Sequence, residues 1–331
     1  MEKTKELNTF LITGATGFLG NMIAKKIADT YTNIRFIFIV RDKNIARKMY
    51  SIDFSDKNIE IIYIESNLEE MDIQEIQYDI DYIIHCAAIT DSKKMVTYPV
   101  EVADGIVIGT KKVLQLAKEK QIKSMVYISS MEVYGRIKAD DELISEECLG
   151  DILINSERSC YSLGKRIAEH YCYIYFKEYD IPVKTARLAQ TFGKGVAKKD
   201  NRVYAQFARA VIDNRDIVLH TDGMSMGNYC ASEDVVEGIL TILYKGKNGE
   251  SYNVVNENNT MTIREMAETV AEKIAKGRIK VVFDIDNSKN YGYAPNTGLR
   301  LSSKKLCELG WKPTKNVEEM YRDLIEEFTK K

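Results

Sequence analysis

The sequence has few of the features that mark metal-binding, secreted or membrane proteins. It contains only three histidines, and they are scattered, so we expect no metal site. Its six cysteines form no Cys-x-x-Cys pair, which favours reduced thiols and a cytoplasmic location. No apolar run has the length of a membrane span, and the polar start MEKTKELNT leads directly into a strand, so we expect no signal peptide.

The sequence also has no large excess of one charge and no segment with the composition of an interdomain linker. The 47 basic and 49 acidic residues give a net charge of −2, so we expect neither a nucleic-acid nor a membrane-surface partner. Four prolines, no repeats and no low-complexity tract leave no visible linker between domains. The 331 residues, 45% hydrophobic and 29% charged, suit one large or two modest globular domains.

Apolar runs of strand type alternate with helical patterns over the first 189 residues, which predicts a doubly wound parallel sheet of the α/β class. The predicted strands are 10–13, 34–40, 59–64, 82–86, 125–129 and 183–188, and the clearest helices are 104–120 and 161–178. After Ala189 short strands (217–219, 252–255, 280–283) mix with helices (202–214, 262–276, 317–329), and Thr262–Glu265 reads as a capping box. We therefore predict a dinucleotide-binding domain over 1–189 and a smaller α/β substrate lobe over 190–331, with chain crossings between them.

The segment TFLITGATGFLG carries the strongest functional signal. A predicted strand ends at Thr13, three glycines follow at Gly14, Gly17 and Gly20, and a helical pattern begins at once. This is the strand–turn–helix arrangement of a Rossmann-type fold that holds a dinucleotide pyrophosphate. The backbone N–H groups and the dipole of the helix N-terminus face the anion. The alternative is a turn that only packs.

The end of the second strand bears on the choice of cofactor. An arginine there accommodates the 2′-phosphate of NADP, whereas an acid binds the ribose hydroxyl of NAD. This chain has Arg41 followed by Asp42, and a guanidinium can pair with a phosphate through two hydrogen bonds. NADP(H) is favoured, and NAD(H) stays open because Asp42 could still reach the ribose.

A tyrosine and a lysine four residues apart suggest acid–base chemistry. Tyr161 and Lys165 share one face of a predicted helix, and a neighbouring ammonium stabilises a phenolate. Such a tyrosine can exchange a proton with a sugar hydroxyl while hydride moves to or from nicotinamide. Ser130, at the end of the fifth strand, can hydrogen-bond the reacting oxygen; the alternative is a turn serine.

With these residues the chain resembles the extended short-chain dehydrogenase/reductase family, of the NAD-dependent epimerase/dehydratase type. The motifs are GATGFLG (14–20), HCAA (85–88), SSMEVYG (129–135), YSLGK (161–165), RLAQTFG (187–193), YNVVN (252–256) and LGWKP (309–313). The resemblance implies that Ser130, Tyr161 and Lys165 form the catalytic triad. It also implies that Gly14, Thr16, Gly17, Phe18 and Leu19 hold the pyrophosphate, that Asn67 and Leu68 flank the adenine, and that Ala87 and Ala88 line the ribose and nicotinamide path.

Two local likenesses narrow the expectation. Glu132 occupies the position of an active-site glutamate of 4,6-dehydratases and UDP-glucuronate decarboxylases, and the run ERSCYSLGKRIAE resembles the decarboxylase's tyrosine helix. We therefore count Glu132 among the catalytic candidates; the alternative is a solvated strand-end carboxylate.

The substrate side departs from the family pattern. Gln190 and Gly227 stand where the family usually has an asparagine and a diphosphate-binding arginine. Gln190, Arg202 and Arg300 are therefore the substrate-binding candidates, the two arginines as replacements for the missing cation.

The resemblance implies hydride transfer at a secondary alcohol or ketone carbon of a nucleotide-activated sugar or sugar phosphate, in surface-polysaccharide or sugar-nucleotide synthesis. Two alternatives stay open. One is a net NADPH-dependent reductase of a nucleotide-linked or phosphorylated keto sugar, and the other is a non-catalytic dinucleotide sensor. Family members commonly pair through helices of the dinucleotide domain, which implies a homodimer.

Overall fold

The computed structural model describes residues 7–54, 59–137, 143–286 and 298–330 and divides into two compact units. Unit 1 comprises Met1–Gly135, Asp151–Arg187 and Ile239–Tyr252, and unit 2 comprises Arg136–Gly150, Leu188–Gly238 and Asn253–Lys331. The chain therefore passes between the units several times.

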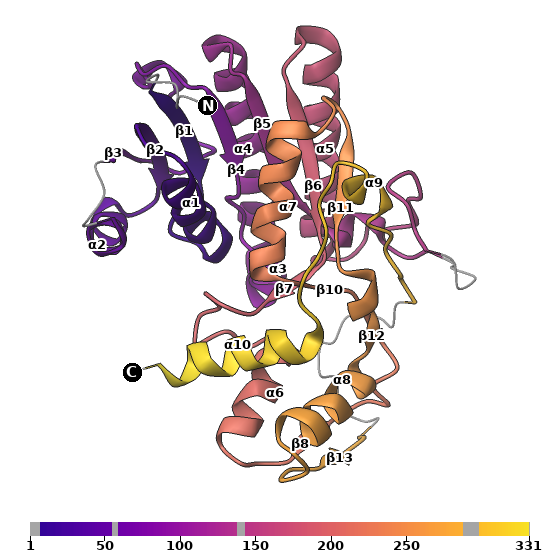
Figure 1. Ribbon diagram of the computed structural model, residues 1–331. Helices are drawn as coiled ribbons and strands as arrows, with labels where there is room; N and C mark the ends of the chain where they lie inside the picture. The colour runs from indigo at the N-terminus through magenta and orange to yellow at the C-terminus, as the bar shows by residue number, and fades with distance from the viewer. Residues whose placement is uncertain (1–6, 55–58, 138–142, 287–297, 331) are drawn as a thin grey trace. The chain divides into compact units, whose positions relative to one another are not determined.

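Unit 1 is built on a sheet with strand order β11-β6-β5-β4-β1-β2-β3 (Figure 1). The strands are β1 (Asn8–Thr13), β2 (Ile34–Val40), β3 (Glu60–Glu65), β4 (Tyr82–His85), β5 (Ser124–Ser130), β6 (Val183–Leu188) and β11 (Ser251–Val254), whose last two residues belong to unit 2. β1 pairs in parallel with both β2 and β4, so the strand order reverses at β1. The predicted Rossmann-type α/β class is confirmed.

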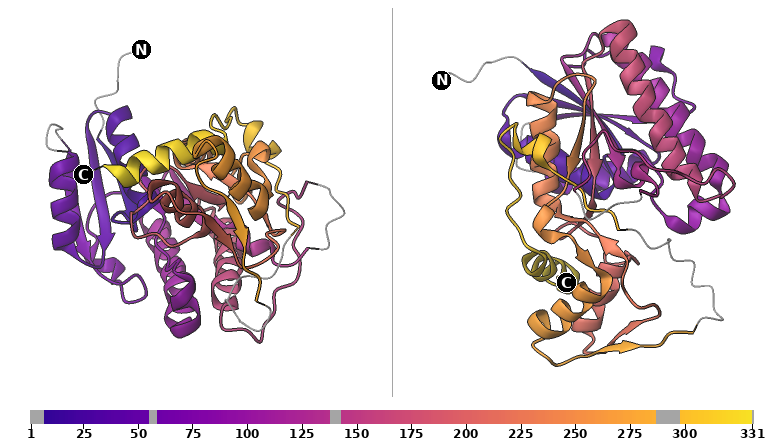
Figure 2. Two further views of the ribbon diagram at one scale, coloured as in Figure 1. Left: turned by 90° about the horizontal axis from the view of Figure 1, so that it is seen from below. Right: turned by 90° about the vertical axis from the view of Figure 1, so that its right-hand side faces the viewer.

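Helices cover both faces of this sheet. Figures 1 and 2 show α1 on one face and α4 and α5 on the other. The helices of unit 1 are α1 (Phe18–Thr30), α2 (Lys43–Asp53), α3 (Ser92–Thr97), α4 (Pro99–Lys120), α5 (Ser159–Tyr179) and the second half of α7 (Ser232–Lys245), with 3₁₀ turns η1 (Ile73–Glu75) and η2 (Met131–Tyr134).

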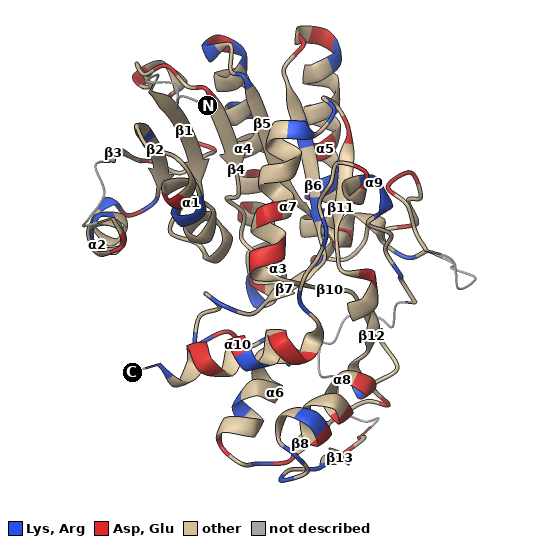
Figure 3. Ribbon diagram, viewed as in Figure 1, with Lys and Arg blue, Asp and Glu red and all other residues tan. Residues whose placement is uncertain are grey.

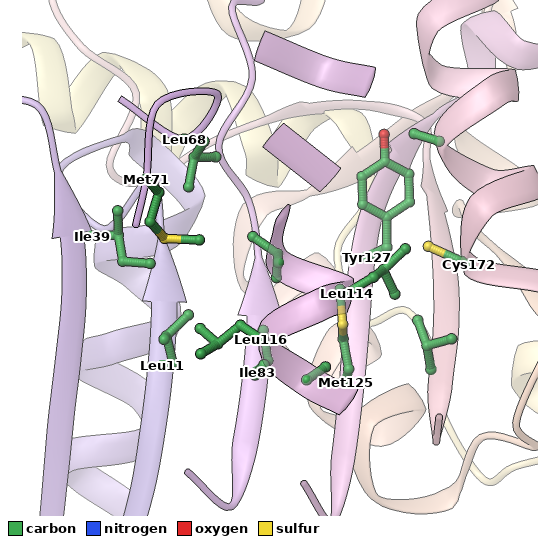
Figure 4. Packing of buried hydrophobic residues seen from close by; sticks show 14 of the residues in the cluster. Leu11, Ile39, Leu68, Met71, Ile83, Leu114, Leu116, Met125, Tyr127 and Cys172 are labelled. Carbon is green, nitrogen blue, oxygen red and sulfur yellow. The ribbon is translucent and has the colours of Figure 1, made fainter. Parts of the chain in front are cut away.

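Alternate side chains of the central strands fill two separate layers, as the period of two requires. On one face an aromatic ladder runs from Phe36 to Phe38 (ring centroids 5.1 Å apart) and on to Tyr50 of α2 (4.4 Å). On the other face Leu11 and Met125 belong to the apolar cluster beneath α4 and α5 (Figure 4). Burial on both faces fixes the register of the strands and therefore the position of the loops at their carboxyl ends.

Unit 2 consists of short paired strands and helices. Its strands are β7 (Gln190–Phe192), β8 (Ile217–Leu219), β9 (Met226–Gly227), β10 (Tyr229–Ala231), β12 (Met261–Thr262) and β13 (Val281–Phe283). Its helices are α6 (Val203–Ile212), the first half of α7, α8 (Ile263–Thr269), α9 (Lys304–Cys307) and α10 (Val317–Thr329), with a 3₁₀ turn η3 (Glu257–Asn259) and a π-helical turn η4 (Val270–Ile274). Phe192 lies at the centre of a buried aromatic cluster with Tyr204, Tyr229 and Tyr321.

The predicted elements agree with the structure except at some ends and in the second half of one helix. The strands predicted over 34–40, 183–188 and 217–219 and the helix over 317–329 have their predicted bounds. The capping box at Thr262 is confirmed, because Glu265 N–H donates to its hydroxyl.

Two predicted helices need correction. The helix predicted over 104–120 starts at Pro99, a residue suited to the first helical position. The helix predicted over 262–276 is wrong in its second half: it becomes π-helical at Val270, where Ala275 N–H bonds to Val270 O. Apolar periodicity does not register such a one-residue change of hydrogen-bonding step.

Both signs of charge are interspersed on the outer helices, for example on α2 and α10 (Figure 3). No helix in the described part of the chain is long and apolar enough to cross a bilayer.

Candidate active site

The glycine turn after β1 has the steric demands of a phosphate-binding loop. Gly14 has φ +68°, and a Cβ there would lie 2.9 Å from Ala87 Cα. A Cβ on Gly20 would lie 2.3 Å from Gly14 O, so α1 packs against the turn with no room for a side chain. Only glycine satisfies both positions.

The N-terminus of α1 is open to an anion. Its N-cap is Gly17, which offers no side-chain hydrogen bond, and the first turn carries no acidic residue. The first N–H groups of the helix therefore have no side-chain cap, and the positive end of the helix dipole is not neutralised. Thr16, Phe18 and Leu19 are half-buried around this end. The residues present fit a dinucleotide pyrophosphate.

The two charged residues that follow β2, Arg41 and Asp42, lie in different surroundings. Arg41 is exposed. The Asp42 carboxylate instead caps α2, because its Oδ1 accepts hydrogen bonds from Asn44 N and Ile45 N, both at 2.9 Å. Capping is therefore a structural use for Asp42 that the sequence reasoning had not considered.

The predicted adenine-flanking pair follows β3. Asn67 Nδ2 donates to Glu70 Oε2 at 3.0 Å. Leu68 is buried, and it is the neighbour that a Cβ on Gly109 of α4 would meet, at 3.0 Å. Leu68 is therefore held against α4.

A buried histidine ties β1 to β4 at the glycine turn. His85 Nδ1 lies 2.7 Å from Thr13 Oγ1, and its Nε2 lies 3.0 Å from Thr110 Oγ1. Thr13 Oγ1 also accepts the Ala87 N–H at 3.1 Å, which fixes the start of the Ala87–Ala88 segment. Burial, with a smaller contribution from the charge of Lys165, lowers the pKa of His85 to about 3, so the ring is neutral at ordinary pH.

Tyr161 and Lys165 lie one turn apart on α5, and both are buried. Lys165 Nζ donates to Ile128 O at 2.7 Å and lies 5.8 Å from the centroid of the Tyr161 ring. It also lies 4.7 Å from the centroid of the Tyr127 ring. Burial lowers the pKa of Lys165 to about 8, against the opposing effects of Cys86, Glu169 and Cys172. The structure thus places Lys165 and Tyr161 on the same side of α5, with Nζ near the tyrosine ring.

Ser130 ends β5 and begins the η2 turn. Its Oγ accepts the backbone N–H of Glu132 at 3.2 Å, which leaves the hydroxyl proton to donate elsewhere. The Glu132 carboxylate is gripped by Arg158, with Nη1–Oε2 at 2.6 Å and Nη2–Oε1 at 3.0 Å. Both side chains are about one-third exposed. Glu132 is therefore half of a partly exposed ion pair at the start of η2.

Other charged side chains hold the η2 turn against α5. Arg166 Nε donates to Val133 O at 2.6 Å. Arg187, at the end of β6, pairs with Glu169 (Nη2–Oε2, 2.7 Å) and donates to the Tyr134 hydroxyl at 3.1 Å. Arg187 and Glu169 are both nearly buried, so this pair is well shielded from water.

Sequence reasoning assigned no role to Arg158, Arg166, Glu169 or Arg187. The sequence does contain a signal for two of them, since Arg158 and Glu169 lie at three- and four-residue spacing from Tyr161 and Lys165 and so share their side of the helix.

The three substrate-side candidates lie in unit 2. Asn228 joins the backbones around two of them: its O accepts the Gln190 N–H, and its side chain bonds to Leu299 O and Leu301 N on either side of Arg300. Arg300 is exposed. Arg202 Nε instead pairs with Asp200, at 3.1 Å to both carboxylate oxygens.

Comparison with known proteins identifies the family. Residues 10–256 match the NAD dependent epimerase/dehydratase family, and the chain belongs to that family of enzymes.

The chain is 26% identical over 98% of its length to UDP-glucuronic acid decarboxylase 1 of Danio rerio, of which it covers 74%. It is also 26% identical, over 98% of its length, to a trifunctional UDP-glucose 4,6-dehydratase/UDP-4-keto-6-deoxy-D-glucose 3,5-epimerase/UDP-4-keto-L-rhamnose-reductase of Arabidopsis thaliana. It spans about half (48%) of that protein.

A UDP-glucose 4-epimerase of Thermotoga maritima has the same fold. Its crystal structure superposes with a TM-score of 0.80 at 20% identity, covering 97% of this chain and 98% of that one.

Proposed function

We propose that this enzyme acts by hydride transfer at a secondary alcohol or ketone carbon of a nucleotide-activated sugar. The observation that carries the proposal is that unit 1 places Tyr161 and Lys165 together on α5 and also contains the glycine loop and the open N-terminus of α1. The named relatives are a decarboxylase and a dehydratase/epimerase/reductase of UDP-linked sugars, which supports this substrate class.

Each side chain of the proposed site has its own role in the reaction. Tyr161 exchanges a proton with the sugar hydroxyl, and the Lys165 ammonium beside it favours the phenolate. The Ser130 hydroxyl keeps a proton to donate to the reacting oxygen because it already accepts the Glu132 N–H. When bound, the nicotinamide dinucleotide supplies the hydride acceptor or donor. Gly14, Gly17 and the first turn of α1 would hold its pyrophosphate.

We propose NADP(H) as the preferred cofactor. Arg41 is exposed at the end of β2, where a guanidinium can pair with a 2′-phosphate, and the next residue, Asp42, caps α2 through Oδ1. Arg41→Ala should weaken NADP(H) by roughly 10–150-fold and spare NAD(H), which titration of the purified protein with each dinucleotide measures. Equal effects on both dinucleotides would contradict the assignment.

Two net reactions fit this site. A redox-neutral epimerase, dehydratase or decarboxylase path is supported by Glu132 beside Ser130, since a carboxylate there can take the acidic proton next to a transient ketone. A net NADPH-dependent ketoreductase is the second candidate, supported by Arg41. The dinucleotide that copurifies with the protein distinguishes the two reactions. Tightly bound NAD favours the redox-neutral path, and an empty site that binds added NADPH favours the ketoreductase.

The central test is Tyr161→Phe. The variant should bind dinucleotide like the parent protein and lose about 10²–10⁴-fold in turnover of a panel of UDP- and dTDP-sugars and their 4-keto forms. Turnover near that of the parent would refute the proton-transfer role of Tyr161. Dinucleotide binding by the parent protein with no turnover of any sugar would instead favour a sensor.

We also propose a homodimer formed through the outer sides of α4 and α5. Ile108 of α4 and Ile167 and Tyr173 of α5 are exposed apolar side chains in unit 1. Ile108→Glu should reduce the mass measured by light scattering from two chains to one. An unchanged mass would place any association elsewhere.

A further inference from the structure

Arg158 occupies a position that helix stability alone does not favour. It is the N-cap residue of α5, and the first turn of this helix carries no acidic residue. A cation at a helix N-terminus faces the positive end of the dipole and is disfavoured there. The favourable partner of Arg158 comes from another element, the carboxylate of Glu132 in η2.

The contact between them has the geometry of an orienting clamp. Nη1 and Nη2 donate separately to Oε2 and Oε1, at 2.6 and 3.0 Å, so the planar guanidinium sets the plane of the carboxylate. A carboxylate has about four lone-pair sites, so two remain for a proton or a substrate group. The hydrogen bond to Glu132 is the main cause that raises the pKa of Arg158 above its ordinary value, so the guanidinium stays charged.

The clamp lies beside the proposed proton donor. Arg158 is three residues before Tyr161 on the same helix, and its O accepts the Tyr161 N–H at 3.4 Å. The Tyr161 phenol and the Cys160 thiol both lie within electrostatic reach of the guanidinium. Arg158 can therefore act in two ways: by orienting Glu132, or by stabilising the Tyr161 phenolate directly.

We propose that Arg158 is a positioning residue that acts through Glu132, so that the two side chains work as one unit in the step after hydride transfer. The inference rests on the redox-neutral form of the proposed function. The bidentate geometry favours it, since Nη1 and Nη2 each donate one N–H to a different carboxylate oxygen and so hold the plane of the carboxylate. It follows that losing Arg158 has the same consequence as losing the carboxylate.

A double-mutant cycle tests this with Glu132→Gln, Arg158→Gln, the double variant and Arg158→Lys. Two rates are measured on the dinucleotide-loaded protein with a nucleotide sugar that it converts: single-turnover reduction of bound nicotinamide and formation of net product. Each single glutamine variant should lower product formation at least tenfold and leave nicotinamide reduction within threefold. The double variant should match the poorer single variant within twofold. Arg158→Lys should recover part of the rate, since lysine offers a point charge without the fork.

Three outcomes would overturn the role: losses that multiply in the double variant, product formation unaffected in either single variant, or loss of nicotinamide reduction in Arg158→Gln alone. The last would assign Arg158 to Tyr161. Arg322→Gln, which removes an exposed pair with Glu318 on α10, is the matched control and should change neither rate.

If the proposed function itself is wrong, the result is different: Tyr161→Phe then reduces bound nicotinamide as fast as the parent protein does. If no nucleotide sugar is converted, the same cycle is measured on urea unfolding. A coupling below twofold in the unfolding equilibrium constant then shows that the two side chains do not hold each other and refutes the clamp.

Discussion

Replacing Lys165 by methionine should remove activity and yet stabilise the fold. The ammonium is almost fully buried, with 2% of the residue exposed, and the described residues place no carboxylate in an ion pair with it. Burial lowers its pKa from 10.5 to about 8. At about 1.36 kcal/mol for each pH unit, keeping this lysine charged in the folded protein costs about 3 kcal/mol at pH 7.

Methionine fills a similar volume without the charge. It leaves Ile128 O without its donor, which costs about 1 kcal/mol, so the net gain in the free energy of unfolding should be about 2 kcal/mol at pH 7. Turnover should fall by at least about 10²-fold because Tyr161 loses its neighbouring cation. Dinucleotide binding should weaken as well, since the ammonium is expected to reach the nicotinamide ribose.

The stability of the parent protein should depend on pH because the pKa of Lys165 differs between the folded and unfolded states. Between about pH 8 and pH 10.5 the unfolded lysine keeps its proton while the folded one has lost it. The unfolded state then binds more protons, so the stability of the parent protein rises with pH through this interval. The variant lacks this rise, and its advantage should shrink from about 2 kcal/mol at pH 7 to near zero or below at about pH 10.

Urea unfolding of dinucleotide-free protein at the two pH values measures the difference. Lys111→Met, at an exposed site on α4, is the control and should change stability by less than about 0.5 kcal/mol at either pH. A Lys165 variant that is less stable than the parent at pH 7, or whose advantage does not depend on pH, would refute the assignment of a costly buried charge.

Three further predictions concern the same unit. Gly20→Ala should weaken dinucleotide binding, measured by titration, because its Cβ would lie 2.3 Å from Gly14 O. Gly105→Ala in α4 is the control: its Cβ would meet only one side-chain atom, at 4.0 Å, so the free energy of unfolding should rise by about 0.5–1 kcal/mol. Arg187→Met should cost about 3–5 kcal/mol in urea unfolding by stranding the buried Glu169 carboxylate, and adding Glu169→Leu should recover most of it. His85, with its pKa lowered to about 3, binds its proton more readily when unfolded, so acid from pH 7 to 5 should cost the parent about 2 kcal/mol that His85→Asn does not lose.

The fold class was predictable because its signals are local. Alternating apolar runs and helical patterns specify βαβ units, and a run such as Ile34–Val40, buried along nearly its whole length, can only be an inner strand. The glycine motif was equally readable, since Gly14 and Gly20 are required by a positive φ and by a close backbone approach. Four-residue spacing placed Tyr161 and Lys165 on one helix face for the same reason.

The sequence by itself thus determined the alternation of strands and helices, the glycine turn and the tyrosine–lysine pair, because each depends on residues close together in the chain. Only the tertiary structure decided what the charged residues do. It paired Glu132 of η2 with Arg158 of α5, and Arg187 of β6 with Glu169 of α5. Ion pairs between distant segments depend on how far apart folding leaves two side chains and how much water remains around them, and neither quantity is encoded in local spacing.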